Sequence, residues 1–143
     1  MTQEAIDEKK SALREELYQY FVKEQYRIDA AKGITGHRHP LACHNDGYGD
    51  QQDKQPDILA YDPRSKSYAV GITRATREEL DSDGSLTEYN VFLDQKDPAT
   101  GTPFRLYIIV PESLVNDLTS LIHHYIHREY WFKVIIVSSQ IIG

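Results

Sequence analysis

The order of apolar segments near the end of the chain constrains the fold most strongly. Residues 104–110 and 131–138 are apolar runs of strand length, and residues 111–125 between them carry leucines at helical spacing. Pro111 is suited to the first turn of this helix. A strand, a helix and a second strand in this order usually pair in parallel through a right-handed crossover. The C-terminal part therefore predicts the parallel portion of an α/β sheet.

The middle of the chain predicts an antiparallel hairpin followed by a helix. Residues 57–61 and 67–73 are rich in strand-forming side chains, and residues 62–66 between them are typical of a turn. Ser85 and Glu88 then have the spacing of a capping box, in which each side chain accepts from a free backbone N–H. We expect a second helix to begin there.

The N-terminal part predicts one long amphipathic helix over residues 4–31, because its apolar residues recur three to four positions apart. Gly33 would end it. Residues 38–44 are predicted as a first strand and residues 44–56 as a polar surface loop. The predicted fold is α/β, with a mixed central sheet flanked by helices in the order α-β-β-β-α-β-α-β, and residues 1–143 form one domain.

Charge and cysteine content narrow the classes of protein. The net charge of −6 weighs against broad electrostatic binding of nucleic acid, although an acidic protein can still hold a local basic groove. The single cysteine, Cys43, cannot form an internal disulfide, and the first ten residues are charged where a secretory signal would be apolar. The apolar runs are too short to cross a bilayer. We expect a cytoplasmic protein that does not enter membranes.

One motif carries a resemblance to a known family. Pro56 and Asp57 head a hydrophobic strand, and a short hairpin leads into the next strand. Together with the element order, this resembles the PD-(D/E)xK restriction-endonuclease-like superfamily over nearly the whole chain. The resemblance implies a restriction-endonuclease-like fold. In active members, an aspartate at the position of Asp57 and an acid on the next strand bind Mg²⁺, and a lysine two positions later helps to position the attacking water.

The next strand of this chain lacks that (D/E)xK tripeptide. Depending on register, the equivalent residues are Gly71-Ile72-Thr73 or Ile72-Thr73-Arg74, and neither set contains an acid. Arg74 would keep a cation at the lysine position, but a guanidinium is always protonated and substitutes poorly for a tunable ammonium. A solvated strand end is the other interpretation of Arg74. The resemblance therefore implies a degenerate, non-catalytic domain that acts as a nucleic-acid- or protein-binding subunit.

A displaced carboxylate is the alternative. Glu24 lies on the predicted apolar stripe of the first helix, and Glu78, Glu79 and Glu88 follow the strand that lacks the acid. With one of them, Asp57 would form the site of an active Mg-dependent nuclease. Each also has a structural interpretation: a solvent-exposed ion pair for Glu24, a capping box for Glu88 and a turn cap for Asp57.

The histidines and the cysteine invite a metal hypothesis. Residues 37–44 hold three histidines and Cys43, but without the paired spacing of a zinc site, so edge-strand side chains are the competing interpretation. His123 and His127 are one helical turn apart on the polar side of their helix and lack a third ligand. We expect both to face solvent, and we expect Cys43 to be a buried, small apolar residue.

A third functional hypothesis is a protein-interaction module with no link to nucleic acid, which the acidic net charge favours. Exposed strand edges would also allow a homodimer.

Overall fold

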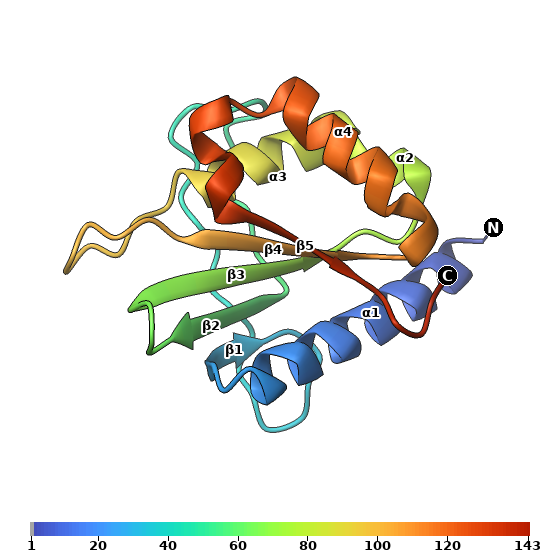
Figure 1. The fold of residues 1–143 in the computed structure, drawn as a ribbon, viewed down its shortest axis with the longest axis horizontal. Helices are drawn as coiled ribbons and strands as arrows, with labels where there is room; N and C mark the ends of the chain where they lie inside the picture. The colour runs from blue at the N-terminus through green and yellow to red at the C-terminus, as the bar shows by residue number, and fades with distance from the viewer. Residues whose placement is uncertain (1) are drawn as a thin grey trace.

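A five-stranded sheet organises the computed structural model, which describes residues 2–143 (Figure 1). The strands are β1 (Arg27–Ala31), β2 (Ile58–Asp62), β3 (Ser67–Thr73), β4 (Arg105–Val110) and β5 (Val134–Ser138). The helices are α1 (Gln3–Lys23), α2 (Arg77–Leu80), α3 (Asp83–Leu93) and α4 (Val115–Tyr125), with 3₁₀ turns η1 (Glu112–Leu114) and η2 (Arg128–Lys133). The α/β class is confirmed, and α2 is a short helix that the predicted order lacked.

The sheet is mixed, as predicted, and its strands lie in chain order. β1, β2 and β3 pair antiparallel, whereas β3, β4 and β5 pair in parallel. Ile58 at the start of β2 lies opposite Gly71 near the end of β3. Asp57, which precedes Ile58, is therefore placed at the same sheet edge as the carboxyl ends of the three parallel strands.

Helix α1 covers one face of the sheet, and α2, α3 and α4 lie on the other (Figure 1). Under α1, Leu13, Leu17 and Phe21 are fully buried and belong to a cluster with Ala60 and Tyr107 of the sheet. We call this the α1 cluster.

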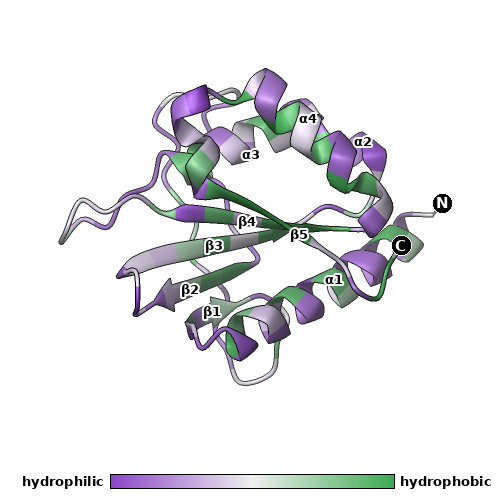
Figure 2. Cartoon of the chain, viewed as in Figure 1, coloured by the Kyte–Doolittle hydropathy of each residue, from purple (hydrophilic) through white to green (hydrophobic). Residues whose placement is uncertain are grey.

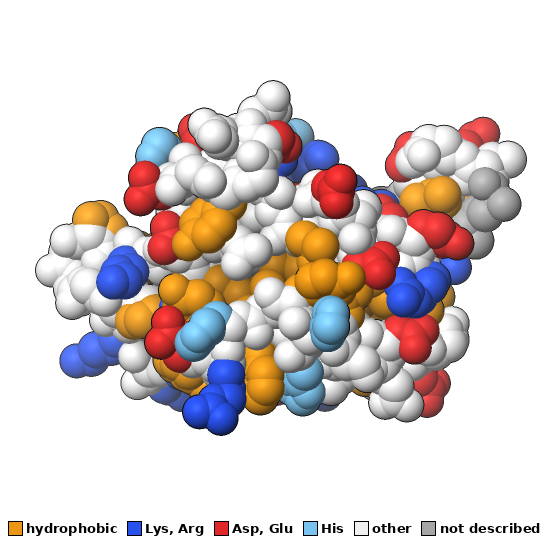
Figure 3. Space-filling model, turned by 90° about the horizontal axis from the view of Figure 1, so that it is seen from above, with side chains coloured by type: hydrophobic (Ala, Val, Ile, Leu, Met, Phe, Trp, Pro, Cys, Tyr) orange, Lys and Arg blue, Asp and Glu red, His pale blue; other side chains and the backbone are white. Residues whose placement is uncertain are grey.

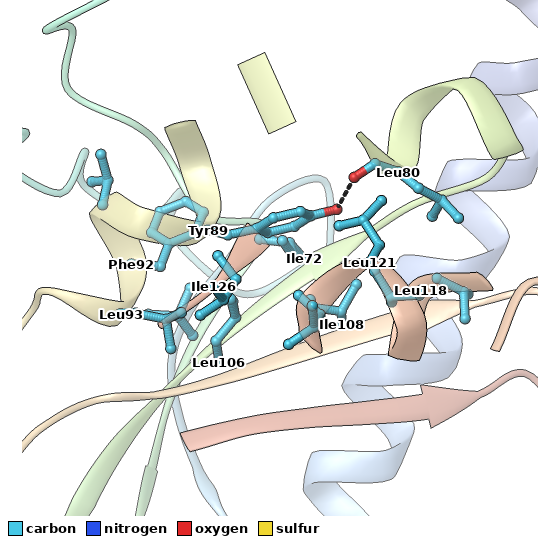
Figure 4. Close-up of a cluster of buried hydrophobic side chains, with 14 residues drawn as sticks. Ile72, Leu80, Tyr89, Phe92, Leu93, Leu106, Ile108, Leu118, Leu121 and Ile126 are labelled. Atoms are coloured by element: carbon cyan, nitrogen blue, oxygen red, sulfur yellow. Dashed lines mark hydrogen bonds between the residues drawn. The ribbon is translucent and has the colours of Figure 1, made fainter. Parts of the chain in front are cut away.

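A second cluster, the α3/α4 cluster, fills the opposite face. Figure 4 shows Tyr89, Phe92 and Leu93 of α3 facing Leu106 and Ile108 of the sheet and the leucines of α4. The Tyr89 hydroxyl donates to the Leu80 carbonyl at 2.8 Å, which satisfies a polar group inside this apolar cluster. Figure 2 shows β5 and most of β4 as hydrophobic, whereas hydrophilic residues recur along α1 and α4.

The prediction of one helix over residues 4–31 is wrong in its second half. α1 ends at Lys23, because Gln25 adopts a left-handed conformation with φ of 65°. The Tyr26 N–H then donates to the Phe21 carbonyl at 2.9 Å, which closes the helix end. Ile28, which fits the helical spacing, lies on β1 instead and still packs against the α1 cluster.

The predicted first strand over residues 38–44 is also wrong. β1 lies earlier in the chain, and residues 38–44 form no strand: they carry an isolated bridge between Cys43 and Lys54, and the Arg38 carbonyl accepts from the Ala31 N–H at 2.9 Å. Residues 44–56 form an irregular loop, as predicted, which is held by buried Asn45: its side chain bonds the carbonyls of Tyr48 and Gln52.

The predicted capping box at Ser85 and Glu88 is wrong as well. α3 begins earlier, with Ser82 as its N-cap, and the Ser85 hydroxyl donates to the Glu79 carbonyl. A capping box does occur at the start of α2, between Thr76 and Glu79. Both pairs have the same spacing in the sequence, so only the tertiary structure distinguishes them.

The C-terminal helix and strand are confirmed with shifted bounds. η1 precedes α4, and η2 occupies residues that were predicted as the start of the last strand. None of the helices within residues 2–143 combines the length and the apolar character needed to cross a membrane.

Candidate functional site

Asp57 lies at the start of β2 and is bound on several sides. Its Oδ2 accepts from both the backbone N–H of Thr73, at 3.1 Å, and the Thr73 hydroxyl, at 3.2 Å. Its Oδ1 lies 3.7 Å from Nη1 of Arg14 on α1. The side chains of Asp57 and Arg14 are only 18% and 17% exposed. The carboxylate is therefore neutralised and hydrogen-bonded from within the chain.

The Arg14 guanidinium can lie next to Asp57 because a glycine, Gly33, leaves space for it. Gly33, which has a φ of +68°, lies beneath the guanidinium, and a Cβ added there would be 3.1 Å from Nη2 of Arg14. Arg14 was not among the predicted site residues. The sequence marks it only as one of the polar residues of the first helix, which says nothing about its distance from Asp57.

Gly71 faces α1, and its position is closed to a larger side chain. A Cβ at Gly71 would lie 2.8 Å from Cδ2 of Leu17 and 3.1 Å from Cε2 of Phe21. Both of these side chains are fully buried. The packing of α1 therefore leaves no space at this position for the carboxylate of an aspartate or glutamate.

Arg74 shares Thr73 as a partner with Asp57, but its other partners lie on α3. Its Nη2 lies 2.8 Å from Oε1 of Glu88, its Nε donates to the Tyr89 hydroxyl at 3.2 Å, and its Nη1 donates to the Thr73 carbonyl. Burial opposes the charged form of Arg74, but Tyr89 and Glu88 outweigh it, so its pKa lies above the ordinary value. The Arg74 side chain is 5% exposed. The structure therefore ties Arg74 to α3, away from solvent.

Glu79, one of the candidates for a displaced carboxylate, is paired with a side chain of α1, as Asp57 is. Its carboxylate lies 2.9 Å from Nζ of Lys10 and accepts from the N–H of Ala75 at 2.7 Å. Burial raises its pKa, but Lys10 and the Ala75 N–H lower it more, so the pKa lies below the ordinary value. Lys10 and Arg14 are four residues apart on α1, and each neutralises its own carboxylate.

The other candidate carboxylates lie elsewhere. Glu24 is exposed beyond the end of α1, and its carbonyl accepts from Arg64 in the turn that follows β2. It is therefore at the opposite end of β2 from Asp57. Glu88 is bound to Arg74, and Glu78 is exposed. Of the predicted residues, Asp57, Glu24 and Arg74 are not brought together into one site.

A cavity of about 700 Å³ opens near the carboxyl ends of the parallel strands. Thr76 and Glu78 line it after β3, Ser113 lines it after β4, and Lys9 of α1 closes one side. In open α/β sheets, ligands usually bind outside the carboxyl ends of the strands. This cavity and Asp57 share that edge of the sheet.

The residues present do not fit a divalent metal. Mg²⁺ requires carboxylate oxygens that are free to bind it, and here Asp57 is bound to Thr73 and Arg14. Within residues 2–143, no three His, Cys, Asp or Glu side chains are grouped closely enough to hold a metal ion. No catalytic step through a metal can therefore be built from this arrangement.

The histidines and Cys43 occupy separate places. His37 hydrogen-bonds Tyr18 at 2.9 Å, whereas His39 and His44 are exposed. Burial, with a smaller effect of Asp53, raises the pKa of the Cys43 thiol to about 11, and a protonated thiol is a poor metal ligand. The residue is only partly buried.

His123 and His127 are exposed, as predicted. His123 packs its ring 4.4 Å from that of Trp131, and His127 lies beyond the end of α4. The two therefore do not form a pair on one helix.

A comparison of the chain with family models, curated proteins and solved structures finds no match.

Proposed function

We propose that this chain is a restriction-endonuclease-like domain without metal-dependent catalysis, which acts as a nucleic-acid-binding subunit. The observation that carries the proposal is the internal neutralisation of Asp57 by Thr73 and Arg14, next to the closed position at Gly71. Two-carboxylate nucleases hold Mg²⁺ between an aspartate and a second acid. Here the aspartate has other partners and the second position has no room.

The architecture supports the nuclease-like part of the proposal. The long first helix, the β2–β3 hairpin and the parallel β3-β4-β5 unit occur in the order that the resemblance implies. Asp57 heads β2 at the edge where the family's aspartate is expected. Thr73 occupies the position of the lysine in the register that begins at Gly71.

Nucleic acid is the partner that this architecture favours, in spite of the net charge of −6. On the face that carries α3 and α4, the basic side chains are scattered among acidic ones, so that face offers no broad electropositive surface (Figure 3). Lys9 at the cavity and exposed Lys32 instead give the carboxyl edge local cations, whereas Arg77 is paired with Asp81 and Asp117. Local cations of this kind allow phosphate contacts without a basic protein.

A nicking assay tests the absence of catalysis. We expect supercoiled plasmid to stay intact with excess protein in either Mg²⁺ or Mn²⁺. Cleavage that disappears in Asp57→Ala would overturn the proposal in favour of a working nuclease with a displaced carboxylate. Glu79→Gln would then show whether Glu79 of α2, which pairs with Lys10 of α1, supplies that carboxylate.

A salt-dependent binding titration tests the nucleic-acid partner. We expect binding at low ionic strength that weakens steadily as salt is added, because phosphate contacts release counterions. If the protein binds neither single-stranded nor duplex DNA even at low salt, a protein-interaction module is the better description. The exposed Phe132 of η2, at 77%, would then be the first surface residue to substitute.

A second copy of the chain is a further proposed partner. β5 is an edge strand, and residues 134–143 contain no charged side chain. β1, the other edge, carries the ion pair of Arg27 and Asp29 and an irregularity in its register, which are devices that discourage pairing. Light scattering of the wild type and of Ile136→Lys tests this: a dimer that becomes a monomer supports pairing through β5.

A further inference from the structure

One row of side chains crosses four strands at the hairpin end of the sheet. In the antiparallel register Arg27 lies opposite Tyr61, and Tyr61 lies opposite Tyr68. Ala69 pairs with Arg105, so Tyr68 is level with Phe104, which precedes β4. Directly opposite residues point to the same face of a sheet. We call Tyr61, Tyr68 and Phe104 the aromatic row.

The rings of the aromatic row are in contact from one strand to the next. The ring centroids of Tyr61 and Tyr68 are 4.9 Å apart, and those of Tyr68 and Phe104 are 5.3 Å apart. The Arg27 guanidinium lies over the Tyr61 ring, 4.7 Å from its centroid. The Tyr61 and Tyr68 rings meet edge to face at 66°, and the Tyr68 and Phe104 rings are tilted by 44°. The four side chains therefore form one row of aromatic contacts that ends in a cation, which we call the strip.

The two tyrosines of this strip do not serve the core. Tyr61 and Tyr68 belong to neither the α1 cluster nor the α3/α4 cluster among the described residues. Both are partly exposed. Leu59 of β2 and Phe104 pack against the α3/α4 cluster, whereas Tyr61 and Tyr68 lie beyond its edge. The strip is therefore accessible at the end of the sheet near the hairpin turn.

Cations accompany the strip. The Arg27 side chain is 59% exposed, and its hydrogen bond to Asp29 raises its pKa, so it stays charged. Lys66 in the hairpin turn and Lys96, which is bridged to Pro103 beside Phe104, are both exposed. Partly exposed aromatic rings with cations beside them are typical of sites that bind single-stranded nucleic acid, where bases stack on the rings and phosphates contact the cations.

We infer that the aromatic row is a stacking platform for the bases of single-stranded nucleic acid, with Arg27 at its end as a phosphate or base contact. The inference rests on the proposed nucleic-acid function and gives it a place and a ligand class. The platform takes a few consecutive bases without strong sequence preference, because every base has a π face. It lies at the opposite end of β2 from Asp57, so it is separate from the nuclease-like edge.

The competing explanation is local: a cross-strand tyrosine pair also stabilises a hairpin. Tyr→Leu separates the two roles, because leucine keeps an apolar side chain on the strand but removes the π surface. Tyr125 supplies a matched control. It is a tyrosine outside both clusters, 52% exposed, but it lies on α4, away from the platform.

The test is fluorescence anisotropy with labelled oligothymidylate and oligoadenylate of about 20 nucleotides, beside a duplex of the same length. We expect Tyr68→Leu and Tyr61→Leu each to weaken single-strand binding about tenfold, the effect of losing one stacked base. Tyr125→Leu should bind as the wild type does. Arg27→Gln should weaken binding and lower its salt dependence by about one phosphate contact. Thermal unfolding of each variant confirms that it is folded.

The results of these measurements distinguish failure of the stacking platform from failure of the proposed nucleic-acid function. If single strands bind and the two tyrosine variants bind them equally well, the platform is wrong while the nucleic-acid function stands. Binding of duplex alone also overturns the platform only. If neither single strands nor duplex bind at low salt, the proposed function itself fails, and the platform fails with it. An equal loss in Tyr125→Leu shows that the effect is not local and overturns the platform.

Discussion

Two arginine–carboxylate pairs flank the end of β3, and they differ in tightness. Arg74 and Glu88 are 2.8 Å apart, with Arg74 5% exposed and bonded as well to Tyr89. Arg14 and Asp57 are 3.7 Å apart and both partly exposed. The first pair is largely buried and has several hydrogen bonds, as is typical of an interaction that stabilises the fold. The second neutralises an aspartate at the sheet edge while leaving it near solvent, which is where a binding surface is expected.

Removing the tighter pair, Arg74 and Glu88, should have the largest effect on stability. Arg74→Leu removes the partner of Glu88 and leaves the Thr73 carbonyl and Tyr89 hydroxyl with fewer donors, so we expect a loss of about 3 kcal/mol in the free energy of unfolding. Urea denaturation measures it. Arg77→Ala is the matched control, since Arg77 is half exposed in its ion pairs and should change stability by less than about 0.5 kcal/mol. Equal effects would contradict the ranking of the two sites.

Gly71, near the Arg14–Asp57 pair, is expected to tolerate no side chain. Gly71→Ala places a Cβ against Leu17 and Phe21, so we expect a loss of about 1–3 kcal/mol in the free energy of unfolding. Gly84→Ala is the control. It lies in α3, where the added Cβ has nothing within 4 Å apart from its own stretch of helix, and it should stabilise by about 0.5–1 kcal/mol. A neutral Gly71→Ala would mean that α1 yields and that a carboxylate could be accommodated there.

Asp57→Ala distinguishes a structural role of the Arg14–Asp57 pair from a catalytic one. It removes the acceptor for the Thr73 N–H and hydroxyl, so we expect a loss of about 1–2 kcal/mol in the free energy of unfolding. Residues at working catalytic sites often behave in the opposite way, because their removal relieves stored repulsion. An increase in stability would therefore favour the nuclease alternative. Chemical denaturation of both proteins at pH 7 distinguishes the two.

The smallest expected effect is a pH dependence at Glu79. Its pKa in the folded chain lies below the ordinary 4.5, so its ionised form contributes stability above pH 4.5. That contribution is lost as the pH falls through the folded pKa. Glu79→Gln should therefore be less stable than the wild type by about 1 kcal/mol at neutral pH, with the difference disappearing in acid. Exposed Glu78→Gln is the control, and a difference that persists at low pH would contradict the role of charge.

The two halves of the sheet were predicted with unequal success. The β2–β3 hairpin and the parallel strands were recognised because turn residues and strand–helix–strand order are local signals. β1 was missed because Ile28 keeps the helical spacing of α1, and only the turn at Gln25 breaks it. Glu24 was misplaced for the same reason. It leaves the apolar stripe once the helix ends before it.

The candidate site was predicted only in part. The sequence identified Asp57 and the lack of an acid on β3, since both follow from residue identity and strand order. It could not identify Arg14, whose ion pair joins residues 43 positions apart through the packing of α1. Nor could it show that Ser85 and Glu88 form no capping box, because spacing alone does not reveal that Glu88 binds Arg74.

The sequence by itself determined the α/β class, the hairpin and the lack of an acidic residue on β3, because periodicity, turn chemistry and residue identity are local properties of the chain. Only the tertiary structure decided that Gly71 has no room for a side chain, that Asp57 is neutralised by Arg14, and that Tyr61, Tyr68 and Phe104 meet in one row. These facts depend on which elements pack together and in what register, and contacts between distant residues leave no periodic signal along the chain.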